Sequence, residues 1–237
     1  MKTRVCLAML VVLTLLVCSG AWADVSSGWL PVVPVTIADT GVNWGPTTMS
    51  VPQWDSSLYP GYHLTKVYLS FGGNVTGSIE YENQDPASGA TVTGTLSALE
   101  RLKDPTDTTT LILINPSDFR TDNLPLFDGT SDFGGLSGRT YLGVSGTDSG
   151  LWSDTSAFYL AMFTGAGNVD LKASAVGASS ATGGGNTTSR FVTDAGATLQ
   201  VQYDYAEDTD IPEPGSMALL ALALPGLGFL RRRRNKK

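Results

Sequence analysis

Apolar and polar residues alternate along most of this chain, in short runs separated by Gly, Asn, Asp and Pro. An alternation with a period of two is typical of a half-buried β-strand, whose successive side chains face opposite sides of a sheet. It is clearest in TLQVQYDYA, residues 198–206, where Leu, Val and Tyr alternate with Gln and Asp. By the same pattern, or as apolar runs of strand length, further strands are predicted at 32–37, 47–54, 64–71, 75–82, 110–115, 139–144, 157–163 and 168–175.

About ten such strands joined by turn residues predict an all-β fold, a single antiparallel β-sandwich or jelly-roll-like domain over residues 24–205. Pro34 and Pro52 are expected at sheet edges or bulges, because proline cannot donate to a central ladder. The continuous apolar run at 110–115 suits either a central strand covered on both faces or a short buried helix.

Two segments depart from the strand pattern. GTLSALERLKDP, residues 94–105, has leucines three residues apart and a terminating proline, which predict a helix, although the same letters also suit a strand and a turn. GASSATGGGNTTS, residues 177–189, is small, polar and of low complexity, and it predicts a mobile loop.

The first 23 residues have the three parts of a secretory signal peptide. A basic start, MKTR, precedes an apolar run that ends at an A-x-A cleavage site formed by Ala21 and Ala23. We therefore expect export through the general secretory translocon, with cleavage after Ala23. A lipoprotein signal centred on Cys18 is the alternative, but Val17 is bulkier than the residue that usually precedes an acylated cysteine.

The charge of the chain is segregated. Residues 24–230 hold all 22 acidic residues but only seven of the 15 basic ones, so this stretch carries a formal charge of −15 while the whole chain carries −7. A surface that acidic repels phosphate backbones, so nucleic acid is not an expected partner. Both cysteines, Cys6 and Cys18, fall in the signal peptide, so the exported part can form neither a disulfide nor a cysteine metal site.

After an acidic linker at 206–211, the chain ends in a tail, residues 212–237, that differs from the body. The tail consists, in order, of Pro212, Glu213 and Pro214, the 16 uncharged residues 215–230, and Arg231, Arg232, Arg233 and Arg234. A helix of that length spans roughly 24 Å, short of the roughly 30 Å hydrocarbon core, and an internal Pro-Gly pair weakens it. The arginines hold their end on the cytoplasmic side. We therefore expect a hydrophobic helix that inserts only transiently into the inner membrane.

This order of Pro-Glu-Pro, apolar run and basic cluster closely resembles the PEP-CTERM sorting signal of exported bacterial proteins. Ile211 stands where valine is more usual. The resemblance implies that an exosortase-type membrane peptidase recognises the tail and removes it. The body is then released or transferred to the surface of a Gram-negative cell that makes extracellular polysaccharide. The alternative is a tail that stays in place as a membrane anchor.

The body, residues 24–205, resembles the choice-of-anchor E domain. The segments that carry the resemblance are Trp54-Asp55, Leu64-Thr65-Lys66-Val67, Gly77-Ser78-Ile79, Phe163–Gly167 and Val201–Tyr205. In that family an aromatic-Asp strand end is followed by a Leu-Thr-x-Val strand and a Gly-Ser-Ile strand, and a Val-x-Tyr-x-Tyr strand closes the domain. The resemblance implies a domain that precedes a surface anchor, and it brings no catalytic residues.

Residue types needed for catalysis are scarce in the body. His63 is the only histidine, so a His-based zinc site is excluded for one chain, and no Gly-x-Ser-x-Gly motif is present. Glu80 with Glu82, and Asp204 with Glu207, are the remaining carboxylate pairs for glycoside hydrolysis. In so acidic a body such pairs arise by chance, so we expect no catalytic residues and no enzyme activity.

Two binding functions stay open. Acid-rich loops at 128–135 and 204–210 offer oxygen ligands for calcium, the one cofactor considered, but neither has EF-hand spacing and no metal site is predicted. Aromatic residues in or near loops, foremost Trp54 and Trp152, offer rings that stack on sugars, although aromatic residues of a sandwich usually fill its core.

These observations predict a non-catalytic protein of the cell surface or the extracellular matrix, placed among exopolysaccharide. The alternatives are a secreted carbohydrate-binding module that uses Trp54 and Trp152, and a secreted glycoside hydrolase.

Overall fold

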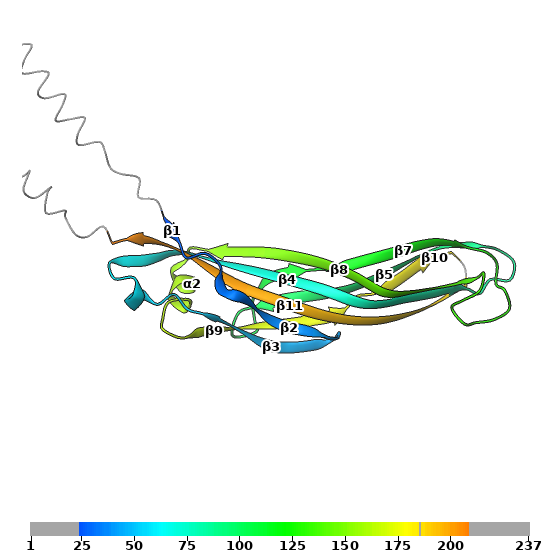
Figure 1. The fold of residues 1–237 in the computed structure, drawn as a ribbon, viewed down its shortest axis with the longest axis horizontal. Helices are drawn as coiled ribbons and strands as arrows, with labels where there is room; N and C mark the ends of the chain where they lie inside the picture. The colour runs from blue at the N-terminus through cyan, green and yellow to red at the C-terminus, as the bar shows by residue number, and fades with distance from the viewer. Residues whose placement is uncertain (1–23, 185, 209–237) are drawn as a thin grey trace, which may run out of the picture. The chain divides into compact units, whose positions relative to one another are not determined.

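The computed structural model describes residues 24–184 and 186–208, and most of them lie in β-strands (Figure 1). The predicted signal peptide and the predicted hydrophobic helix of the tail lie outside the described residues. Besides the short helices η1 (Ser56–Leu58) and α2 (Ala157–Met162), the elements are β1 (Val25–Ser26), β2 (Leu30–Gly41), β3 (Trp44–Pro52), β4 (Tyr62–Asn83), β5 (Ala90–Lys103), β6 (Thr110–Ile114), β7 (Ser117–Leu124), β8 (Gly138–Asp154), β9 (Asn168–Gly177), β10 (Ser180–Gly183) and β11 (Thr187–Glu207).

The described residues form two units. The larger unit, Asp24–Tyr59 with Leu64–Tyr205, is called the sandwich below. The smaller unit contains Pro60–His63 and the end of β11 from Ala206 onward. No helix among residues 24–184 and 186–208 is long and apolar enough to cross a membrane.

The sandwich has two antiparallel sheets. In the first sheet β8, β4 and β11 lie in that order, and β1 and β2 both pair with the far side of β11. In the second sheet β3 pairs with β9, and β9 and β10 pair with one side of β5. The other side of β5 pairs with β6 and then β7, which together cover its whole length.

The strand order defines a jelly roll. Counting β1–β2, β6–β7 and β9–β10 as one position each gives eight positions in chain order, arranged 1-8-3-6 in the first sheet and 2-7-4-5 in the second. The first position therefore pairs with the last, the second with the seventh, the third with the sixth and the fourth with the fifth, as in a long hairpin rolled into two layers. The predicted all-β sandwich fold is confirmed.

The core lies between the two sheets and comes from alternate residues of the long strands. In β5 the residues Val92, Leu96, Ala98 and Leu102 are fully buried, while Thr93, Thr95, Leu99 and Arg101, which face the other way, are half-buried. Each buried Val or Leu side chain stabilises the fold by about 1.5–3 kcal/mol when it leaves water. One cluster of buried residues joins both sheets and contains Val75, Ile79, Tyr81, Val92, Leu96, Ala98, Leu124, Val144, Ala175 and Ala195.

The helix predicted at 94–105 is wrong, because residues 94–103 belong to β5. Leu96 and Leu102, six residues apart, both face the core, whereas Leu99 lies on the opposite face and is half-buried. Pairing with strands on both sides satisfies the backbone of this segment, and tertiary pairing therefore overrides the local spacing.

Three further predictions need correction. The strand predicted at 157–163 is mostly the helix α2, whose apolar run has no polar alternation to place it in a sheet. The loop predicted at 177–189 instead contains β10 and the start of β11. The run at 110–115 is a strand, β6, but it lies at a sheet edge and leaves Leu113 55% exposed.

The other predicted segments are strands, but those predicted at 64–71 and 75–82 form the single strand β4 and the one predicted at 47–54 ends at Pro52. Both prolines lie where expected. Pro34 falls where β2 bulges from its pairing with β11, and Pro52 is the last residue of the edge strand β3.

Candidate functional site

Trp54 belongs to a packed aromatic group. Its side chain is 4% exposed and stacks on Tyr59, with ring centroids 5.9 Å apart and planes 12° apart. The Tyr205 ring lies 6.2 Å from Trp54 and 4.9 Å from Tyr59. Backbone hydrogen bonds from Trp54 N–H to the Phe163 carbonyl and from Gly165 N–H to the Trp54 carbonyl fix the segment. The burial leaves this indole little surface for a sugar ring.

Trp152 belongs to a different aromatic group. It lies on β8 opposite Leu69 and is half-buried, with its ring edge-on to Tyr159 at 4.8 Å. Phe158 contacts Tyr159 at 5.0 Å and is 65% exposed. Burial raises the pKa of Tyr159, and the charges of nearby carboxylates add to the effect. The two tryptophans predicted to contact glycan therefore belong to separate ring groups.

The carboxylate pair on β4 is bound to structural partners. Glu80 is 8% exposed and pairs with Arg190, whose hydrogen bond holds the pKa of that carboxyl below its usual value. Glu82 is fully buried and accepts hydrogen bonds from Phe133 N–H at 2.9 Å and from the Ser137 hydroxyl at 3.2 Å. Each carboxylate is thereby fixed in the fold by a partner of its own.

Glu100 was not predicted as a special residue, and it is the most unusual carboxyl of the sandwich. It is fully buried on β5, and both carboxyl oxygens have no hydrogen-bond partner among the described residues. Burial, together with the charges of Asp148 and Asp39, raises its pKa to about 8. A Cβ at Gly73 would collide with this carboxyl, so β4 has no side chain where Glu100 crosses the core. In the sequence, the only indication that Glu100 is buried was its position between Ala98 and Leu102, on the same face of a strand.

The acid-rich loop at 128–135 binds its own backbone. Asp128 accepts hydrogen bonds from Thr130 N–H at 3.1 Å and Leu136 N–H at 3.0 Å, and these bonds lower its pKa. Asp132 accepts one from Gly134 N–H at 2.8 Å. Within residues 24–184 and 186–208 no three acidic or histidine side chains are placed to hold a metal ion.

The smaller unit ties the end of β11 to the turn before β4. Asp208 N–H donates to the Gly61 carbonyl at 2.8 Å, and its carboxylate lies 2.9 Å from His63 Nδ1. The Tyr62 hydroxyl donates to Glu207 at 3.0 Å. The chain's only histidine thus contacts the segment that leads into the tail. Of the predicted acidic linker, Ala206 and Glu207 are the last residues of β11.

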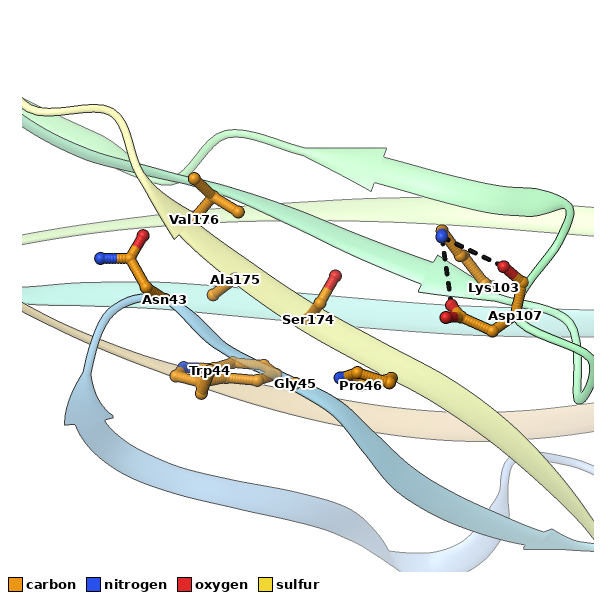
Figure 2. Close-up of a pocket in the computed structure, with 9 residues that line it drawn as sticks. All are labelled: Asn43, Trp44, Gly45, Pro46, Lys103, Asp107, Ser174, Ala175 and Val176. Atoms are coloured by element: carbon orange, nitrogen blue, oxygen red, sulfur yellow. Dashed lines mark hydrogen bonds and ion pairs between the residues drawn. The ribbon is translucent and has the colours of Figure 1, made fainter.

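A pocket of about 270 Å³ opens on the second sheet (Figure 2). At one of its ends the Lys103 ammonium lies 3.1 Å from the Asp107 carboxylate. The residues that line it are Asn43, Trp44, Gly45, Pro46, Lys103, Asp107, Ser174, Ala175 and Val176.

A comparison with protein families matches residues 210–234 to the PEP-CTERM protein-sorting motif. The match contains the predicted Pro212, Glu213 and Pro214 and ends at the last of the four arginines, Arg234. It indicates an exosortase substrate, and with it export and membrane-associated sorting toward the cell surface. These tail residues lie outside the described part of the chain. No curated protein matches.

Two solved structures of viral particles resemble this chain weakly. A chain of the T=1 particles derived from infectious bursal virus is 15% identical, with a TM-score of 0.15, over 86% of this chain and 48% of that one. A chain of the infectious bursal disease virus VP2 subviral particle is 14% identical, with a TM-score of 0.16, over 86% of this chain and 50% of that one. This chain spans about half the length of each. TM-scores this low do not support a shared fold, so the assignment of a jelly roll depends on the strand order alone.

Proposed function

We propose that this chain is a non-catalytic protein of the cell surface or the extracellular matrix, displayed after an exosortase has removed its tail. The observation that carries the proposal is the sorting motif at 210–234. Membrane insertion is transient, because the apolar run is too short and too interrupted to hold the protein in the bilayer. The body acts outside the cell, among exopolysaccharide.

The architecture of the body supports a display role. A jelly roll whose two sheets bury their inner faces against each other is stable without disulfides or metal, and the exported chain has no cysteine. We assign it to the choice-of-anchor E type on the motifs of β4, β11 and the Phe163–Gly167 turn. A structural body also agrees with the partners of Glu80 and Glu82, which bind Arg190 and the 133–137 loop.

Variants of the sorting motif test this function. In a cell that contains an exosortase, the natural protein is expected outside the inner membrane and without its tail. Replacing Pro212, Glu213 and Pro214 together by alanine removes the extended recognition segment but leaves the apolar run intact. The variant is expected to accumulate in the inner membrane at full length. As a matched control, Pro225→Ala changes a tail proline outside the Pro-Glu-Pro segment and should still be processed.

Equal processing of the triple variant and the natural protein would contradict recognition of the motif. Retention of the natural protein at full length in the inner membrane would instead support the anchor alternative. A shift in tail cleavage with no change in the folding of the body would show that sorting and the jelly roll are separate properties.

Carbohydrate binding through loop aromatics remains the second candidate, and Trp152 carries it. The exposed face of Phe158 lies beside Tyr159, which the Trp152 ring contacts in turn, so this group offers apolar surface to a sugar. A glycan array that compares the natural protein with Trp152→Ala tests this candidate. Unchanged binding after the substitution removes it.

A further inference from the structure

Three basic side chains meet on the outer face of the second sheet, where β5 pairs with β9. Lys103 lies directly opposite Lys172, and Arg101 lies two residues back along β5, opposite Ser174. These three residues, Arg101, Lys103 and Lys172, are called the basic strip. Their neighbour Leu102 is fully buried in the core, so the strip faces outward, and all three side chains are half-buried.

The strip is not balanced by the acids of the chain. Residues 24–184 and 186–208 contain twenty acidic and seven basic residues, and the three arginines outside the strip each pair with a carboxylate. Arg101, by contrast, has no hydrogen bond or ion pair with any described residue. Lys172 donates to the Thr48 hydroxyl at 2.7 Å and contacts no described carboxylate.

This arrangement weakens the fold instead of supporting it. Like charges directly opposite each other on antiparallel strands are destabilising, which is the situation of Lys103 and Lys172. A chain so rich in Asp and Glu has carboxylates available for every base, and yet only Lys103 of the three has one, Asp107. The cations are therefore placed for an anion that the chain itself does not supply.

The pocket of Figure 2 continues the strip. Lys103, paired with Asp107, and Ser174 line it, so one wall is charged and polar, while Pro46 and Val176 give it apolar surface. Figure 2 shows Lys103 and Asp107 at one end of the pocket and Asn43 with Val176 at the other. A ligand that fits here has an anionic group for the strip and a less polar ring or chain for the pocket.

We propose that the basic strip and the adjoining pocket bind a carboxylate-bearing polysaccharide, a polyuronate. A guanidinium donates two parallel N–H groups to a carboxylate, which suits the unpaired Arg101, and ring carbons of a sugar fit against Pro46 and Val176. Neighbouring strands are about 4.8 Å apart, and alternate residues of one strand about 6.8 Å apart. Cations spread over such distances match repeated charges of a polymer better than one small anion.

The net negative charge of the body does not prevent this binding. Charges on the surface are screened beyond about 8 Å at physiological salt. Of the acids, Asp107 contacts Lys103, and Asp170 lies two residues from Lys172 on the same outward face, where it accepts a hydrogen bond from Ser50. Three cations and two carboxylates thus lie on the outward face, while Asp104, next to Lys103, is 6% exposed and accepts hydrogen bonds from Thr106, Thr108 and Thr109 instead. The proposal does not depend on the sorting signal.

Titration of the exported protein with polygalacturonate tests the proposal, with uncharged dextran as the comparison polymer. The variant Arg101→Gln/Lys103→Gln/Lys172→Gln is expected to bind about tenfold more weakly or worse, and to fold normally, because it removes a like-charge pair. The matched control Lys66→Gln/Arg120→Gln/Arg139→Gln removes three positive charges elsewhere and should keep its affinity. Binding of the natural protein should weaken as salt is raised.

Other outcomes overturn the proposal. Equal weakening in both triple variants assigns the effect to overall charge, and binding to dextran sulfate but not to polygalacturonate assigns the strip to another anion. Absence of polygalacturonate binding by the natural protein contradicts the proposal. If the natural protein self-associates and only the strip variant does not, the strip binds another copy of the chain instead of a polyuronate. If the strip variant does not fold, the single variant Arg101→Gln is tested instead, because Arg101 has no hydrogen bond or ion pair with a described residue. An unchanged affinity of this variant for polygalacturonate contradicts the proposal.

Discussion

Replacing Glu100 by glutamine should stabilise the sandwich, by an amount that depends on pH. In the unfolded chain this carboxyl has its ordinary pKa of 4.5 and is ionised at neutral pH, whereas in the fold its pKa is about 8 and it stays protonated. The folded state thus holds one more proton between these two values. The contribution of Glu100 to the free energy of unfolding therefore falls as pH rises from 4.5 to about 8, and this contribution is level below and above that window.

The size of the effect follows from the pKa. Each pH unit in the window costs about 1.4 kcal/mol, so Glu100 destabilises the sandwich by roughly 3 kcal/mol at pH 7 and roughly 5 kcal/mol above pH 8. Glutamine has the shape of the protonated acid and does not titrate. Glu100→Gln should therefore match the natural protein near pH 4.5 and exceed its unfolding free energy by roughly 3 kcal/mol at pH 7.

Urea unfolding followed by tryptophan fluorescence, at several pH values between about 4.5 and 9, measures this difference. Glu82→Gln is the control, because Glu82 is also fully buried but accepts two hydrogen bonds, so its replacement should destabilise. A stability difference for Glu100→Gln that does not change with pH, or a destabilisation at pH 7, would refute the argument that Glu100 is buried as an unpaired acid.

Two further substitutions test the packing. Trp54→Ala should lower the free energy of unfolding by about 3–5 kcal/mol, since it removes a buried ring stacked on Tyr59. Urea unfolding measures this change, and a variant as stable as the natural protein would contradict the packing of Trp54. Gly94→Ala places a Cβ 2.5 Å from the Ile79 side chain and 2.9 Å from the Tyr81 ring. Calorimetry should show a lower melting temperature, by an amount corresponding to about 1–3 kcal/mol, and an unchanged value would show that the core there has room.

The fold class could be read from the sequence because most strands have one buried face. Alternation marked segments of β4, β9 and β11 correctly, but in residues 94–105 the three-residue spacing of the leucines favoured a helix. The decisive fact was non-local: this segment has strands on both sides. Residues 157–163 failed for the opposite reason, since a continuous apolar run contains no period to read.

Among the functional features, too, those formed by consecutive residues were predicted, and those formed by residues distant in the sequence were not. The sorting signal was predicted because it is linear, and its three parts keep their order whatever the body does. The basic strip was not predicted, because Arg101 and Lys172 are distant in the sequence and only the β5–β9 register brings them together. Trp54 was expected at a surface, since its neighbours are turn residues, yet the rings of Tyr59 and Tyr205 cover it.

The central claim is that the tail is a sorting signal that is cut away, and the intact mass of the protein recovered from outside the cell tests it most directly. The account predicts a chain that begins near Asp24 and lacks the apolar run at 215–230 together with the arginines that follow. A secreted or surface-exposed chain whose mass includes residues 215–237 would contradict it.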